Sequence, residues 1–200
     1  MKVLGITGGI GSGKSIVCKV FAQLGIPVYE ADAEVKKMYL THDAMKAGLR
    51  NKFPGELFTK EGNPDTKKFA AYFFNNEPAL QQLNSLVHPY VKEHFAKWVK
   101  ANSAAPYVIK EAAILFESGS DLGCDRIVTV SAPEDLRFRR VMARDRRSRS
   151  EVEKIIQNQW TDEERKEASD FVITNDEKQM VLPQVLAIHR QMMKLAALEK

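Results

Sequence analysis

A glycine-rich segment that ends in lysine and serine is the most specific chemical signal in the sequence. Residues 8–15 read Gly-Gly-Ile-Gly-Ser-Gly-Lys-Ser and match the phosphate-binding pattern G-x-x-x-x-G-K-[ST] in full. The glycines let backbone N–H groups turn inward, and the helix that follows adds partial positive charge. Lys14 adds a full charge near the β- and γ-phosphates, and the Ser15 hydroxyl can ligate Mg²⁺. We expect the nucleotide phosphates to be bound by Gly9, Ile10, Gly11, Ser12, Gly13, Lys14, Ser15 and the N–H of Ile16.

A loop of this kind leaves three classes of protein open: regulatory GTPases, motor-type ATPases and kinases. The D-x-x-G and N-K-x-D motifs of a GTPase do not occur, because Asn51-Lys52 is followed by Phe53-Pro54. A motor ATPase usually has a strand of four apolar residues followed by Asp. Residues 107–111 read Tyr-Val-Ile-Lys-Glu, which matches that pattern only weakly. The small size and the arginine-rich segment favour a kinase that closes over two substrates.

Two acidic residues follow predicted strands. Asp32 lies just beyond the strand 28–30, and carboxyl ends of parallel strands face the ligand crevice. Asp32 could accept the proton of an attacking hydroxyl and help to hold Mg²⁺, or it could cap the next helix. Glu117 ends the apolar run 114–116 and could line a substrate pocket, or be an ordinary solvated acid.

Basic side chains supply further candidates. His88 precedes Pro89 in a helical stretch, where the proline should break or kink the helix and could aim the imidazole at a ligand; packing or surface exposure is the alternative. Arg140 and Arg144 are four residues apart and share a helix face, so they could clamp a phosphoryl group or form a solvated basic face. They belong to a dense cluster that comprises Arg137, Arg139, Arg140, Arg144, Arg146, Arg147 and Arg149.

These residues need a scaffold, and the sequence predicts an α/β one. Strands are expected at residues 3–7, 28–30, 107–109, 126–130 and 171–174, and a helix at 14–24 that Gly25 ends. Later helices are expected to open at Pro133 and at the capping boxes Ser150-x-x-Glu153 and Thr161-x-x-Glu164. The alternation predicts a five-stranded parallel sheet flanked by helices. We expect a core of residues 1–32 and 106–200, a lid at about 138–160, and an inserted helical domain at 33–105.

Composition limits the cellular setting. No apolar run approaches the ~20 residues that a membrane span needs, and the N-terminus lacks the features of a signal peptide. Cys18 and Cys124 are too few and too far apart for a disulfide framework or a zinc site, which favours the reducing cytoplasm. The net charge of +4 and the arginine cluster indicate a phosphate partner, which composition alone assigns neither to a nucleic acid nor to a nucleotide.

Several motifs together resemble the dephospho-CoA kinase family along nearly the whole chain. Residues 7–15 look like its signature loop, and Glu30-Ala31-Asp32 is similar to its D-A-D with the first acid altered. Residues 83–91 match its L-N-x-x-x-H-P-x-V motif, and residues 113–117 its P-L-L-F-E motif with Ala for Pro. The R-x-x-x-R-D of its lid corresponds to residues 140–145, a lid-following Gln to Gln159, and A-D-x-V-I-x-N to residues 169–175. The chain departs from the family at Ile16 (often Thr), at Arg137 (often Gln) and at Glu177 (Gly).

The resemblance implies a P-loop kinase fold with an inserted substrate domain and a lid, and the ATP-dependent phosphorylation of the ribose 3′-hydroxyl of 3′-dephospho-CoA with Mg²⁺. It implies that Asp32 is the base, acting with Lys14 and Arg140, that Arg140 and Arg144 serve the phosphates, and that Asn175 approaches the adenine. It places the acceptor against Thr7, Asp32, His88, Phe116 and Glu117. It implies no nucleic-acid, membrane or obligate protein partner. The alternatives are another small-acceptor P-loop kinase, such as a nucleoside or shikimate-type kinase, and a nucleic-acid-binding ATPase.

Overall fold

The computed structural model describes residues 1–73 and 76–198. The chain divides into two compact units, one formed by Met1–Glu30 with Asn102–Lys200 and the other by Ala31–Ala101. Each unit has its own apolar core, so each is a separately packed body.

The first unit contains a five-stranded parallel sheet, as the sequence predicts. Its strands are β1 (Lys2–Thr7), β2 (Val28–Glu30), β3 (Tyr107–Glu111), β4 (Arg126–Ser131) and β5 (Phe171–Thr174). Their order is β2-β3-β1-β4-β5, and every neighbouring pair is parallel. The order places β1 at the centre, with its carboxyl end between those of β3 and β4.

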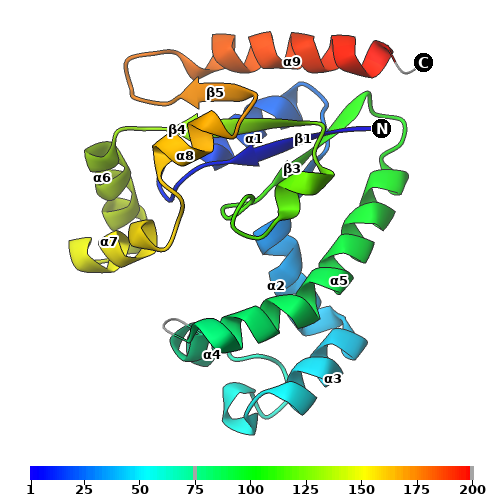
Figure 1. The fold of residues 1–200 in the computed structure, drawn as a ribbon, viewed down its shortest axis with the longest axis vertical. Helices are drawn as coiled ribbons and strands as arrows, with labels where there is room; N and C mark the ends of the chain where they lie inside the picture. Colours follow the sequence, from blue (N-terminus) through cyan, green and yellow to red (C-terminus); the bar gives the residue numbers. More distant parts are fainter. Residues whose placement is uncertain (74–75, 199–200) are drawn as a thin grey trace. The chain divides into compact units, whose positions relative to one another are not determined.

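Helices cover both faces of this sheet (Figure 1). The helical elements of the unit are α1 (Lys14–Gln23), η2 (Ser120–Gly123), α6 (Glu134–Asp145), α7 (Arg149–Gln157), α8 (Asp162–Glu167) and α9 (Val181–Ala197). Ile6 of β1 and Val128 of β4 share one apolar core with residues of α1 and α9. Thr129 points to the opposite face, because side chains alternate along a strand, and its hydroxyl donates to the Arg165 carbonyl of α8 at 3.2 Å.

The end of α1 follows from a single glycine. Gly25 has a φ of 80°, in the left-handed region that glycine reaches without steric cost. The Ile26 N–H donates to the Phe21 carbonyl at 3.2 Å, and the Gly25 N–H donates to the Ala22 carbonyl at 3.0 Å. This pair of bonds is the Schellman arrangement, which stops the helix and turns the chain into β2.

Of the three helix starts predicted in the second half of the chain, two differ from the structure. Pro133 is the N-cap of α6 and not its first helical residue. The capping box of α7 is formed by Ser148 and Glu151 and not by Ser150 and Glu153, since only Ser148 has the extended backbone that lets its hydroxyl reach the N–H three residues on. The predicted box at Thr161 and Glu164 is confirmed at the start of α8.

The second unit is helical. It contains α2 (Ala31–Thr41), α3 (Asp43–Lys52), η1 (Gly55–Leu57), α4 (Thr66–Phe73) and α5 (Glu77–Ala101). Its core is rich in aromatic rings, with Phe69 and Phe73 packed edge to face at 5.3 Å between centroids. Of the break or kink predicted at Pro89, the break does not occur, because α5 continues through the proline as one helix of 25 residues. None of the helices in the described ranges combines the length and apolar character that crossing a bilayer requires.

Candidate active site

The glycine loop joins β1 to α1 and requires glycine at residue 13. Gly13 is the N-cap of α1 and has a φ of 98°, which strains any residue that has a side chain. A Cβ atom at this position would also overlap the Asn175 carboxamide, whose Nδ2 donates to the Ser12 carbonyl at 2.8 Å. The loop is therefore shaped by glycine and held by a residue that directly follows β5.

Positive charge gathers where the loop enters α1. Lys14 and Ser15 form the first turn, whose N–H groups have no partner within the helix and carry partial positive charge. No acidic residue lies in that turn. Lys14 Nζ donates to the Gly8 carbonyl at 2.8 Å, so the ammonium lies against the loop. The ammonium and the helix N-terminus thus offer a site suited to phosphate.

Arg140 and Arg144 share a helix but have different partners. Arg140 Nη1 donates to the Gly11 carbonyl at 3.4 Å, and its Nη2 donates to the Asn175 carbonyl at 3.2 Å. Arg144 instead forms two hydrogen bonds to the Asp145 carboxylate, at 2.7 and 2.9 Å, which hold the pKa of Asp145 below its usual value. The structure thus brings Arg140 and Asn175 to the glycine loop and leaves Arg144 on the surface.

Two carboxylates lie where the neighbouring strands β2 and β3 end. Glu30 ends β2 and Glu111 ends β3, and the two residues are in register. Burial raises the pKa of the Cys18 thiol of α1 well above its ordinary value; the charges of Glu111 and Glu30 raise it further, and that of Lys14 opposes them. Both carboxylates and Lys14 therefore lie near the same part of α1. Glu111 is an alternative candidate for the base, and Glu30 is not among the predicted site residues, although its position at a strand end points to it.

The Phe116–Glu117 segment contacts the chain that precedes α8. The Phe116 and Trp160 rings are stacked, with centroids 5.0 Å apart and planes 7° from parallel. Glu117 Oε1 accepts a hydrogen bond of 2.9 Å from the Trp160 N–H and one of 3.0 Å from Arg165 Nη2. Trp160 and Arg165 were missed by sequence reasoning, because no local pattern marks the partner of Glu117.

The backbone N–H and the backbone carbonyl of Ile10 in the glycine loop are both hydrogen-bonded to residues distant in sequence. Gln159 Oε1 accepts from the Ile10 N–H at 2.9 Å, and Arg137 Nε donates to the Ile10 carbonyl at 3.0 Å. Gln159 and Arg137 also line a cavity of about 560 Å³ at the carboxyl end of β4. A volume of this size is in the range of small-molecule sites.

Three further candidates are placed as follows. The Thr7 hydroxyl, at the carboxyl end of β1, is buried and has no hydrogen-bond partner among the described residues, so it is free to bind a ligand or water. Asp32 and His88 belong to the helical unit. Asp32 is the second residue of α2 and is exposed, and His88 is exposed on α5.

The fold and the loop together define a class of protein. A central parallel strand leads into a complete phosphate-binding loop, and Lys14, Arg140 and Asn175 surround that loop. This arrangement is that of a P-loop kinase.

Comparisons with known proteins identify the family. The dephospho-CoA kinase family model matches residues 2–180, and the chain belongs to that family. A relative named dephospho-CoA kinase from Bacteroides fragilis is 38% identical over 185 residues, which cover 92% of this chain and 90% of the relative. The crystal structure of TT1252 from Thermus thermophilus is similar, with a TM-score of 0.85 and 31% identity over 95% of this chain and 96% of that chain. The structure of dephospho-CoA kinase from Campylobacter jejuni has the same fold, with a TM-score of 0.68 and 24% identity over 97% of this chain and 98% of that chain.

Proposed function

We propose that the protein transfers the γ-phosphoryl group of ATP to the ribose 3′-hydroxyl of 3′-dephospho-CoA and releases coenzyme A and ADP. The observation that carries the proposal is the complete phosphate cradle, in which Lys14 lies against the loop and Asn175 ties the loop to the end of β5. Membership of the dephospho-CoA kinase family supports the choice of acceptor.

On this proposal the loop residues Gly9–Ile16 bind the ATP phosphates, and Lys14 balances the charge that develops in phosphoryl transfer. Arg140 acts beside it, since its guanidinium already contacts the Gly11 carbonyl. Asn175 faces the adenine side. Arg144 joins the phosphates when the proposed lid, residues 138–160, closes, and this movement requires the Arg144–Asp145 pair to open.

We propose that the acceptor binds through Thr7, Asp32, His88, Phe116 and Glu117. Residues 33–105, the proposed substrate domain, include His88, and Asp32 directly precedes them. Asp32 accepts the proton of the 3′-hydroxyl. Its carboxylate is exposed, which suits a proton acceptor that must reach a bound substrate.

Magnesium fits the residues present. Within the described ranges no three His, Cys, Asp or Glu side chains form a complete metal site, and Mg²⁺ usually takes one or two protein ligands together with substrate phosphates. The exposed Ser15 hydroxyl is the proposed ligand. When bound, the ion supplies charge neutralisation to the β- and γ-phosphates.

The proposed setting is the cytoplasm, because Cys18 and Cys124 are free thiols. ATP and 3′-dephospho-CoA are the proposed partners, with no nucleic-acid, membrane or obligate protein partner.

Release of ADP on addition of 3′-dephospho-CoA tests this proposal. Adenosine and shikimate serve as control acceptors, and mass spectrometry identifies coenzyme A as the product. Faster turnover with a control acceptor would replace the proposed substrate. Binding of DNA or RNA that weakens steeply with salt, without acceptor phosphorylation, would favour a nucleic-acid-binding ATPase.

A further inference from the structure

Four charged side chains form a cluster of ion pairs, mostly buried, between the glycine loop and the segment after β3. Arg137 Nη1 lies 2.9 Å from Asp162 Oδ1, Arg165 Nη1 lies 3.6 Å from the same oxygen, and Arg165 Nη2 lies 3.0 Å from Glu117 Oε1. The exposed fractions of these side chains are 6% for Arg137, 12% for Asp162, 0% for Arg165 and 16% for Glu117. Two guanidinium groups and two carboxylates balance one another, so the cluster is neutral only while Asp162 is charged.

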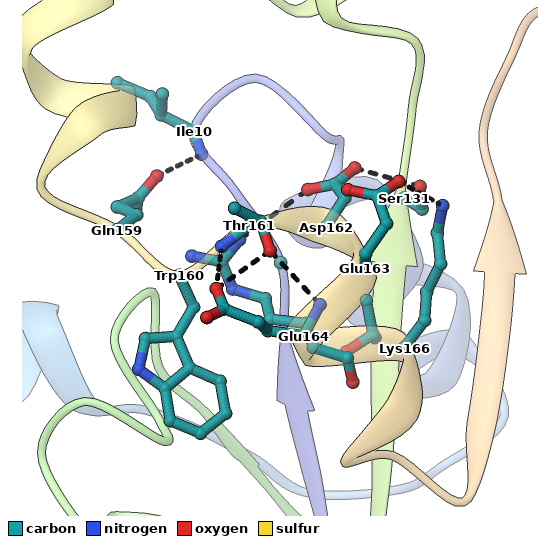
Figure 2. A network of polar contacts seen from close by, with 12 residues as sticks. Ile10, Ser131, Gln159, Trp160, Thr161, Asp162, Glu163, Glu164 and Lys166 are labelled. Atoms are coloured by element: carbon teal, nitrogen blue, oxygen red, sulfur yellow. Dashed lines mark hydrogen bonds and ion pairs between the residues drawn. The ribbon is translucent and has the colours of Figure 1, made fainter.

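Asp162 pairs with both arginines of this cluster, and Figure 2 shows its carboxylate beside Ser131. It is the first residue of α8, and the capping box of Thr161 and Glu164 fixes the start of that helix. Its second oxygen, Oδ2, accepts a hydrogen bond of 3.0 Å from the Ser131 hydroxyl at the end of β4. A carboxylate anchored in this way can set the direction of the guanidinium group that it pairs with.

The geometry of the glycine loop depends on that direction. Arg137 Nε donates a hydrogen bond to the Ile10 carbonyl, while its Nη1 donates one to the Asp162 carboxylate. A trans peptide is planar, so its C=O and N–H point in opposite directions. Holding the Ile10 carbonyl toward Arg137 therefore turns the Gly11 N–H the other way, and inward-facing N–H groups are what a phosphate-binding loop needs.

We infer that Asp162 is a positioning residue for the phosphate-binding loop and acts through Arg137. Asp162 fixes the orientation of the Arg137 guanidinium group. The guanidinium group in turn fixes the orientation of the Ile10–Gly11 peptide, whose N–H faces the nucleotide. Arg165 and Glu117 anchor Asp162 from the other side. The inference deepens the proposed function, on which it rests for the identity of the nucleotide.

The test compares the affinity for Mg–ATP of the unaltered full chain with that of its variants, measured by calorimetry well below the unfolding temperature. Asp162→Asn should raise the dissociation constant about tenfold or more, the scale of one charge-assisted contact. Glu163→Gln is the matched control, since Glu163 is the adjacent acid and its side chain is 77% exposed. The control should leave the affinity unchanged.

A double-mutant cycle separates positioning from general stability. If Asp162 acts through Arg137, the effect of Asp162→Asn should largely disappear in an Arg137→Gln background. Equal effects in both backgrounds, or a lowered unfolding temperature with unchanged ATP affinity, would overturn the inference. Should Asp162→Asn fail to fold, Arg137→Lys replaces it, because a lysine cannot pair with Asp162 and hold the Ile10 carbonyl in the same fork geometry. Unchanged ATP affinity in folded Arg137→Lys would equally refute the inference.

These outcomes are distinct from failure of the proposed function. If the unaltered chain binds ATP but releases no ADP with 3′-dephospho-CoA, the proposed acceptor is wrong, while the affinity comparison still tests Asp162.

Discussion

Asp32→Asn is the substitution that tests the proposed chemistry most directly. Asparagine keeps the shape of the side chain and removes its charge and its capacity to accept a proton. A positioned general base contributes about 10²–10⁴-fold to a rate. At about 1.4 kcal/mol for each factor of ten, this range corresponds to roughly 2.8–5.6 kcal/mol of transition-state stabilisation.

The structure predicts a much smaller effect on folding. Asp32 is the second residue of α2, so it is not the N-cap, and it is exposed. Its contribution to stability is therefore its interaction with the positive end of the helix, about 0.3–1 kcal/mol. In a chain of this size that amounts to a shift of at most ~4 °C in the unfolding midpoint. In free energy, the expected loss of transition-state stabilisation exceeds the expected loss of folding stability several-fold, so the two effects can be measured separately.

The assay follows ADP release at saturating ATP and 3′-dephospho-CoA, with thermal unfolding measured in parallel. Glu34→Gln is the matched control, because Glu34 lies in the same first turn of α2 and pairs with Lys37 at 2.5 Å. The control should lose a similar small amount of stability and keep its turnover. Near wild-type turnover of Asp32→Asn would remove Asp32 from the mechanism, and Glu30, Glu111 and Glu117 would become the next candidates for the base.

Three other expectations follow from the site. Lys14→Ala should lower turnover by roughly 10²-fold or more in a folded protein, and normal turnover would refute the phosphate cradle. Amide exchange in residues 140–150 should slow when ATP and acceptor bind together; equal protection in both states would exclude a closing lid. Burial raises the pKa of Cys124 to about 11, so the thiol is protonated at neutral pH. Its alkylation by iodoacetamide should accelerate about tenfold per pH unit from pH 7 to 10, and a plateau below pH 9 would contradict this.

Much of the fold could be predicted because its signals are local. Each of the five strands is a short apolar run, and Gly25 ends α1 through a backbone conformation that glycine favours. The predictions that failed concern helix boundaries. Ser148 and Ser150 are both possible caps for α7, and the choice depends on the backbone angles that the chain adopts as it leaves α6 through Arg146, whose φ is 53°.

Pro89 illustrates a second limit of local signals. A proline inside a helix removes one hydrogen bond, so the sequence predicts a break or a kink without deciding between them. In the structure α5 continues, because one face of the helix is buried against the aromatic core of its unit through Leu83 and Val87. Packing of that face outweighs the local cost, which no short sequence window shows.

The sequence by itself determined the phosphate-binding loop, because the chemistry of that loop is encoded in eight consecutive residues whose backbone freedom and charge are local properties. Only the tertiary structure decided which distant residues hold that loop. Arg137, Gln159 and Asn175 reach it from three separate segments, and Asp162 joins Arg137 to Arg165 and Glu117. Such contacts depend on how parallel strands align their carboxyl ends and on which charges are buried together, and both are settled only when the chain packs.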